Sequence, residues 1–297
     1  MRKINTLDPN VNKINKNLLS AGIFAASLFL AGCTSEQKTT PSEDFAYKNI
    51  SKITVDSDSW DFDISASDDG EVHISSDKIK EEKDIQLSLD GTELTICQND
   101  SSSKGLSDQF SFGKSGKFTL SLPENTDISL NIHNGSGNMT VQNIQLSDFN
   151  VENDSGALTI SNLTALSAEM FSDSGDIKLT DSSCTKTHMS TKSAYVTLKN
   201  SETREAAFST ESGEVGINNI SGYNSLSIKT GSGDISLSHK NTPESLTYDV
   251  SSGSGDITLK LENLNPASDT EQKKQGIVGS GETSLSVISD SGTVVVK

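Results

Sequence analysis

Apolar residues recur at fixed distances from a small turn residue throughout the second half of the chain. The turn residue stands at eight positions: Gly137, Gly156, Gly175, Ala194, Gly213, Gly233, Gly255 and Gly292. The first five of these positions follow one another at intervals of 19 residues. The positions two and four residues after each turn residue, and five and seven residues before it, are apolar with the single exception of Thr187. Such regularity is typical of an internal structural repeat.

Each repeat unit predicts two short β-strands, because side chains two residues apart lie on the same face of a strand. A Ser-Gly turn joins the two strands, and we expect its glycine to adopt a positive φ angle. A second turn is expected six residues after the first, where stacked side chains can hydrogen-bond to one another. This position holds Asn143, Asn162, Asp181, Asn200 and Asn219.

A single unit cannot bury its own apolar positions, but a stack of units can. We therefore predict an all-β fold in which residues 126–297 form a parallel β-solenoid of about nine coils, each of about 19 residues. The interval of 37 residues between Gly255 and Gly292 is close to two periods and predicts a further, weaker unit at Gly281. An antiparallel meander or a sandwich has no reason to repeat one residue class at every nineteenth position.

Residues 45–125 contain strand-like runs that do not follow the repeat. Examples are Ile53–Val55 and Trp60–Ile64, and turn signals such as Asp69-Gly70 separate several of the runs. We expect this segment to form an irregular β cap over the open end of the solenoid, because an exposed terminal coil would pair with other chains.

Residues 1–32 have the features of a lipoprotein signal peptide. A basic start precedes an apolar run, Leu18 to Ala31, that is short for a membrane span. The run ends in Leu30-Ala31-Gly32-Cys33, which resembles a bacterial lipobox. We expect cleavage before Cys33, lipid (palmitate) attachment to Cys33, and a flexible tether over residues 33–44. The alternative is a signal peptide without lipid, in which Cys33 is incidental.

Charge and composition narrow the functional classes. The chain has 41 acidic and 24 basic residues, and its formal charge of −17 argues against a general nucleic-acid binder. A hydrophobic fraction of only 32% fits a thin rod, because a thin rod has little interior. Cys97 and Cys184 are expected to be buried free thiols, although an exported protein also permits a disulfide between them.

Carboxylates that follow the turn glycines are the best candidates for a chemical site. Glu214, Asp234 and Asp256 are expected to stack in successive coils, with Asp176 two coils away, and carboxylates about 5 Å apart repel one another. We favour solvated acids as the interpretation, with a Ca²⁺ site or a catalytic site as the alternatives. The four histidines fit no metal or triad spacing, and we expect no cofactor.

Several phrases carry a family resemblance: Ile53-Thr-Val, Gly91-Thr-Glu-Leu-Thr-Ile96, Phe118-Thr-Leu-Ser-Leu-Pro123 and the Ser-Gly-Asp repeats. With them the chain resembles the putative-adhesin, DUF4097-type β-strand-repeat proteins of bacteria over residues 48–297. The resemblance implies an exported or membrane-attached solenoid, and no catalytic residue comes with it.

Together these features predict a non-enzymatic, lipid-anchored protein on the outer face of a bacterial cell membrane. A Gram-positive surface is favoured over an outer membrane. The rod would bind or scaffold a glycan or protein of the envelope or of a host, as an adhesin does. One alternative is an envelope-stress accessory that contacts a membrane partner, and another is a carbohydrate-active β-helix enzyme.

Overall fold

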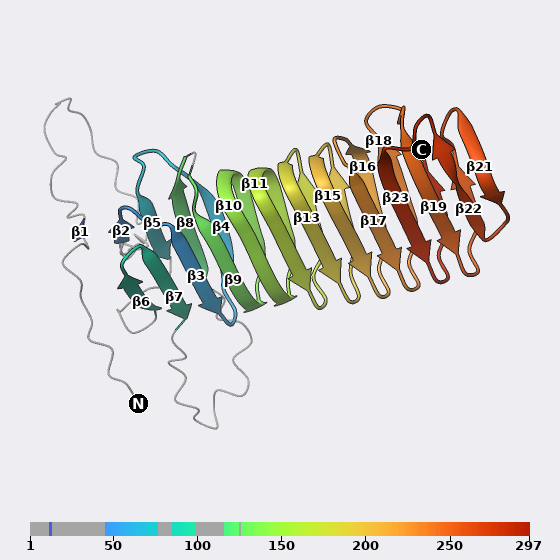
Figure 1. Ribbon diagram of the computed structural model, residues 1–297. Helices are drawn as coiled ribbons and strands as arrows, with labels where there is room; N and C mark the ends of the chain where they lie inside the picture. The colour runs from blue at the N-terminus through green and yellow to red at the C-terminus, as the bar shows by residue number, and fades with distance from the viewer. Residues whose placement is uncertain (1–11, 14–44, 77–84, 99–115, 125) are drawn as a thin grey trace, which may run out of the picture.

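The computed structural model describes residues 12–13, 45–76, 85–98, 116–124 and 126–297. These residues form strands and turns, with no helix among them. Most strands pair in parallel, and successive coils stack into a long rod (Figure 1). The predicted all-β solenoid is therefore confirmed. The predicted lipobox, Cys33 and the tether lie outside the described residues.

The middle of the rod follows the predicted period. It comprises β9 (Ser129–Ser136), β10 (Met139–Ser155), β11 (Leu158–Ser172), β12 (Ile177–Thr180), β13 (Ser183–Thr191), β14 (Val196–Lys199), β15 (Glu202–Thr210), β16 (Val215–Ile220), β17 (Ser225–Thr230) and β18 (Ile235–His239). Met139 lies opposite Leu158, Leu158 opposite Ile177, and Ile177 opposite Val196, so the strand register advances by one repeat at each coil.

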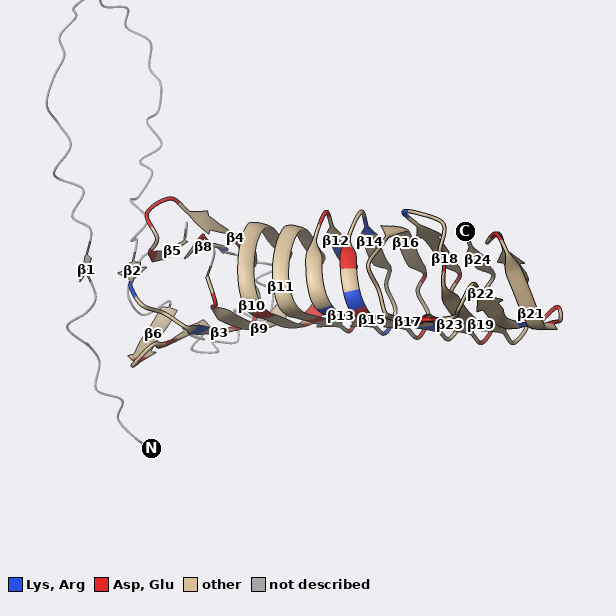
Figure 2. Ribbon diagram, turned by 45° about the horizontal axis from the view of Figure 1, so that its top comes forward, with Lys and Arg blue, Asp and Glu red and all other residues tan. Residues whose placement is uncertain are grey.

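Two rows of strands enclose the core. One row includes β12, β14 and β16, and the other includes β13, β15 and β17 (Figure 2). The apolar positions predicted from the repeat point inward: Ile177 and Val196 in the first row are fully buried, as are Met170 and Met189 in the second. Each coil adds the same small set of apolar side chains to a narrow, continuous core.

A third buried column follows the second turn, and the sequence analysis missed it. It is made of Ile144, Leu163, Ser182 and Ser201, one residue from each of four successive coils. The left-handed residue at the second turn, such as Asn143, interrupts the alternation of the strand. The next inward side chain therefore follows after three residues instead of two, so a period of two cannot find it.

The N-terminal segment adds two more coils to the stack. These are β3 (Lys52–Ser57) with β4 (Asp61–Ser67), and β7 (Glu93–Gln98) with β8 (Lys117–Pro123). Ile53 lies between Leu94 and Leu130 in parallel register, so the coil of β3 and β4 is enclosed on both sides. Segments 52–67, 93–98 and 117–123 therefore extend the regular solenoid, which the expectation of an irregular cap did not anticipate.

Antiparallel strands cover this end of the rod. They are β2 (Phe45–Tyr47), β5 (Val72–Ser76) and β6 (Ile85–Asp90), and β1 (Asn12–Lys13) pairs with β2. Strand β6 pairs with β7, and β5 pairs with β8, so each row of strands has an antiparallel cover.

At the C-terminal end the coils are stacked out of sequence order. The strands are β19 (Leu246–Ser252), β20 (Ile257–Leu259), β21 (Leu264–Asp269), β22 (Lys273–Val278), β23 (Thr283–Ser289) and β24 (Val294–Val296). Strand β23 lies between β17 and β19 (Figure 1). In the other row β24 lies between β18 and β20. The last coil of the chain, β23 with β24, is thus stacked between the two coils that precede it in the sequence.

This order corrects the prediction of a weaker unit at Gly281. Gly281 has a φ angle of 73° and lies in the turn between β22 and β23, not in a coil. Between β20 and β23 the chain instead forms a hairpin of β21 with β22, whose strand β22 pairs antiparallel to β19, and this hairpin covers the end of the rod. Eight coils lie within residues 129–296, and two lie within residues 52–123.

The turn glycines are needed mainly because the coils approach closely. Among the turn glycines of the coils, Gly137 and Gly156 alone have positive φ angles, of 137° and 103°, so the expectation of positive φ is wrong for the others. A Cβ at Gly175, Gly213 or Gly233 would lie 1.5–1.8 Å from a carbonyl oxygen in the preceding coil. Glycine is therefore required there by the contact between coils and not by its backbone conformation.

Candidate functional site

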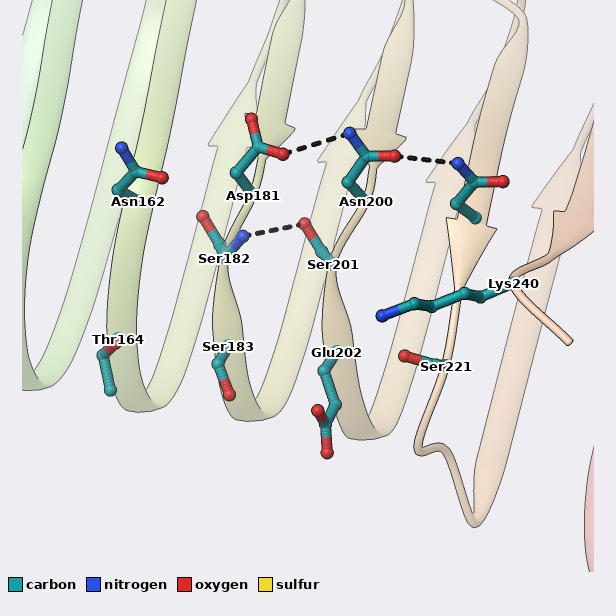
Figure 3. Close-up of a pocket in the computed structure, with 11 residues that line it drawn as sticks. Asn162, Thr164, Asp181, Ser182, Ser183, Asn200, Ser201, Glu202, Ser221 and Lys240 are labelled. Carbon is teal, nitrogen blue, oxygen red and sulfur yellow. Dashed lines mark hydrogen bonds between the residues drawn. The ribbon is translucent and has the colours of Figure 1, made fainter.

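A ladder of side-chain amides runs along one edge of the rod at the second turn. It is made of Asn143, Asn162, Asp181, Asn200 and Asn219, which we call the amide ladder. All five residues have φ angles between 50° and 59°, the left-handed conformation that Asn and Asp tolerate better than other residues. The second turn predicted from the sequence is confirmed, and the side chains of Asn162, Asp181 and Asn200 lie in a row along the rod (Figure 3).

Hydrogen bonds within the amide ladder run in one direction. The Nδ2 of Asn162 donates to Oδ1 of Asn143 at 2.8 Å, and Nδ2 of Asn219 donates to Oδ1 of Asn200 at 2.9 Å. The Nδ2 of Asn200 donates to Oδ1 of Asp181 at 3.0 Å. In each of these bonds the amide donates to the residue on the preceding coil, and Asn200 both accepts from the next coil and donates to the one before.

The ladder is interrupted at Asp181, because a carboxylate has no hydrogen to donate. Its Oδ1 accepts from Asn200, but no ladder hydrogen bond joins Asp181 to Asn162 (Figure 3). Two acceptor groups, the side-chain Oδ1 of Asn162 and the carboxylate of Asp181, thus face solvent. They lie on adjacent coils, which are spaced by about 4.8 Å. Both residues are exposed.

An open groove with a volume of about 500 Å³ lies beside the amide ladder. Its lining comes from five successive coils and includes Asn162, Asp181, Asn200, Glu202, Ser221 and Lys240. We call it the ladder groove. Every lining side chain is an amide, a hydroxyl, a carboxylate or an amine, and Lys240 reaches across from the end of the groove (Figure 3).

The floor of the ladder groove is held by two buried serines. The backbone N–H of Leu163 donates to Oγ of Ser182 at 3.1 Å, and the N–H of Ser182 donates to Oγ of Ser201 at 3.1 Å. The Ser182 hydroxyl itself donates to the carbonyl oxygen of Thr180 at 2.7 Å. These bonds fix the backbone beneath the groove, so its exposed side chains are positioned before any ligand binds.

The carboxylates proposed from the sequence do not form one stack. Thr293 occupies the coil between Asp234 and Asp256, so Glu214 and Asp234 are on adjacent coils but Asp256 is one coil further away. The Oδ1 of Asp234 accepts a hydrogen bond from the N–H of Thr293 at 2.7 Å. The Oδ1 of Asp176 similarly accepts a hydrogen bond from a backbone N–H of the next coil. Calcium binding there stays an untested alternative to solvated acids, and no metal-binding cluster of three or more His, Cys, Asp or Glu occurs among the described residues.

Acidic and basic positions are spread along the rod instead of gathering at one site (Figure 2). The histidines are also dispersed. His73 contacts Asp69, His133 contacts Asp56, and His188 packs against Phe171. They therefore do not converge on a shared reaction centre.

His239 is the histidine with the most enclosed surroundings. Its Nε2 is 2.7 Å from the Tyr223 hydroxyl, and its Nδ1 is 2.7 Å from the carbonyl oxygen of Lys297. Burial lowers the pKa of His239 and raises the pKa of Tyr223, so both groups are neutral at pH 7. The neutral histidine donates from Nδ1 to Lys297 and accepts from Tyr223, which ties the last strand to the coil of β17 and β18.

Both described cysteines are free thiols, as the sequence predicts. Cys184 is buried on β13, and its burial raises its pKa to about 11. Cys97 on β7 is only half-buried, and burial together with the charge of Asp56 raises its pKa. Neither thiol is activated for nucleophilic chemistry at neutral pH.

Comparison with known proteins identifies relatives of this architecture. A family model described as Toastrack DUF4097 matches residues 50–297. The crystal structure of a "putative adhesin" from Bacteroides fragilis is similar with a TM-score of 0.51 and 18% identity, over 86% of this chain and 95% of that one. The crystal structure of a "putative lipid binding protein" from Parabacteroides distasonis is similar with a TM-score of 0.52 and 17% identity, over 86% of this chain and 97% of that one. No curated protein matches the chain.

At such identities the two crystal structures establish a shared fold. They agree with the parallel coils described above. Within the described part of the chain, no helix has the length and apolar character needed to cross a membrane.

Proposed function

The chain belongs to the Toastrack DUF4097 family, and from that premise we propose that it is a lipid-anchored, non-enzymatic binding protein of the bacterial cell surface. In this proposal Cys33 carries the lipid, and residues 34–44 tether the rod to the outer face of the membrane, with a Gram-positive surface favoured. The rod holds the ladder groove away from the membrane, where it is open to an envelope or host ligand, as in an adhesin.

The observation that carries the proposal is the ladder groove on a rigid scaffold. Its lining side chains come from five coils, and hydrogen bonds between coils fix the backbone beneath them. Ten coils spaced by about 4.8 Å give a rod about 45 Å long, which suits presentation of a binding surface. The two crystal structures of similar fold bear the names of an adhesin and a lipid-binding protein, which supports a binding role.

Lipid anchoring is tested by replacing Cys33 with alanine and following the protein in cell fractions. We expect the unmodified chain to sediment with membranes and to incorporate a labelled fatty acid, and Cys33→Ala to lose both properties. Cys97→Ala is the matched control and should fractionate like the unmodified chain. Membrane association and labelling that persist in Cys33→Ala would contradict the lipid anchor.

The binding role is tested by measuring saturable retention of the purified chain on cell-wall, membrane and matrix fractions. Retention by one fraction without turnover of its components is the expected result. Release of soluble products from that fraction would instead indicate a carbohydrate-active enzyme. Co-purification of one membrane protein, with no retention by cell wall or matrix, would favour the regulatory alternative and contradict the adhesin-like role.

A further inference from the structure

We propose that the ladder groove binds a glycan that carries positively charged amino groups, and that Asp181 receives one of those groups. This inference rests on the proposed binding function and names its ligand class. It begins from the interrupted amide ladder, where the carbonyl oxygen of Asn162 and the carboxylate of Asp181 lie on adjacent coils without a donor between them.

The interruption selects for a ligand that donates hydrogen bonds. Carboxylate oxygens only accept, and the Asn162 amide already directs its Nδ2 toward Asn143. Glu202, exposed on the next coil, adds a second carboxylate to the same groove. An ammonium group supplies three donors and a positive charge, so it satisfies both oxygens and offsets the local negative charge.

The backbone around the groove disfavours an extended peptide. A peptide that adds as a strand needs unpaired backbone groups at a sheet edge. Here the backbone groups are already paired. The N–H of Asp181 donates to the backbone carbonyl oxygen of Lys199 at 2.9 Å, and the N–H of Asn200 donates to that of Asn218 at 2.9 Å. Every residue that lines the groove is polar or charged, so none offers an apolar side chain to pack against a side chain of a peptide. The surface offers hydrogen-bonding side chains and no backbone edge.

Sugar rings match this surface, because each hydroxyl can both donate and accept hydrogen bonds. The groove crosses four steps between coils, from Asn162 to Lys240, which is about 19 Å at about 4.8 Å per step. A short oligosaccharide therefore lies along the rod axis with an amino group at Asp181. Lys240 at the far end donates hydrogen bonds to hydroxyl oxygens of the oligosaccharide.

The test uses the whole chain and three tetrasaccharide probes in calorimetric titrations. One probe is a glucosamine tetramer with free amino groups, the second is the same tetramer fully N-acetylated, and the third is a galacturonic acid tetramer. We expect the free amine form to bind at least tenfold more tightly than the acetylated form, and the acidic form not to bind. Raising the salt concentration should weaken binding of the amine form.

Asp181→Asn is the decisive variant because it keeps the shape of the side chain and completes the amide ladder. It should bind the amine tetramer at least tenfold more weakly, while its thermal midpoint stays equal or rises. Glu169→Gln removes the same charge from an exposed position of β11 outside the groove, and its affinity should not change. The intact fold of Asp181→Asn separates a lost contact from a lost structure.

Equal affinity for the amine and acetylated tetramers, or undiminished binding by Asp181→Asn, would overturn the inference. Preference for a basic peptide over the amine tetramer, with the same dependence on Asp181, would also overturn it. If the chain is retained by an envelope fraction and Asp181→Asn is retained equally, the groove is not the binding surface, but the proposed function stands. If the chain neither associates with membranes nor is retained by any fraction, the proposed function itself fails.

Discussion

Replacing Gly213 with alanine tests the physical reason for the turn glycines. A Cβ at residue 213 would lie 1.7 Å from the carbonyl oxygen of Ala194 in the preceding coil. Because the obstacle is a backbone atom, the turn itself must move. Gly213 does not have a positive φ angle, so backbone conformation adds no strain to this substitution.

The turn at Ala194 indicates what such a movement costs. The Thr210 hydroxyl accepts a hydrogen bond from the N–H of Gly213 at 2.9 Å. The corresponding hydroxyl three residues before Ala194 belongs to Thr191, and it is buried without a partner. The Thr210 hydroxyl also donates to the carbonyl oxygen of Ala194 at 3.3 Å, the atom that a Cβ at residue 213 would displace, so we expect Gly213→Ala to break both Thr210 hydrogen bonds. A buried hydroxyl left unpaired costs about 1–3 kcal/mol of unfolding free energy.

The assay is urea unfolding of the whole chain, followed by circular dichroism. Gly216→Ala is the matched control, because a Cβ at Gly216 meets nothing within 4 Å and the residue lacks a positive φ angle. The control should be unchanged or stabilised by roughly 0.4–1 kcal/mol. Equal midpoints for the two variants would refute the argument that close approach of the coils requires glycine.

Three further outcomes are expected. Ile177→Asp places a carboxylate in the fully buried core and should lower the free energy of unfolding by more than about 3 kcal/mol, as measured by urea unfolding. Lys178→Asp, on the exposed face, is the control and should change this free energy by less than about 0.5 kcal/mol. Because burial lowers the pKa of His239 below its ordinary 6.5, the unfolded chain binds this proton more readily. Stability is therefore fully present above about pH 6.5 and falls as the pH drops toward the lowered pKa. His239→Gln should flatten that part of the profile of unfolding free energy against pH, and an unchanged slope would contradict the assignment. Cys184, with its pKa of about 11, should resist a thiol reagent at pH 8 in the folded chain, while Cys97 reacts first; equal rates would contradict the burial difference.

The repeat itself could be predicted from the sequence because every coil uses the same inward positions. Ile177 and Val196 occupy equivalent positions, and each is buried against the other's coil. Ser182 and Ser201 could not be found in this way, since they are polar and follow a left-handed turn that breaks the period of two. The interruption at Asp181 was visible as an Asp among Asn residues, but its meaning depends on the direction of the hydrogen bonds.

The order of the coils could not be predicted from the repeat. The residues of β23 have the inward pattern of a coil, but that pattern fits any neighbouring coil equally well. Its place between β17 and β19 follows from the hairpin of β21 and β22, which covers the terminal coil with antiparallel strands. The N-terminal end uses a similar arrangement, with β3 enclosed between β7 and β9. Covered ends reduce the pairing of one rod with another.

The binding role of the ladder groove is tested most directly by measuring retention of the purified chain on the cell envelope of the bacterium that makes it. The measurement is made with and without competing glucosamine tetramer. We expect saturable retention of the unmodified chain, displacement by the free amine tetramer but not by the acetylated one, and at least tenfold weaker retention of Asp181→Asn. Retention that neither the amine tetramer nor Asp181→Asn reduces would contradict the assignment of the ladder groove as the binding surface.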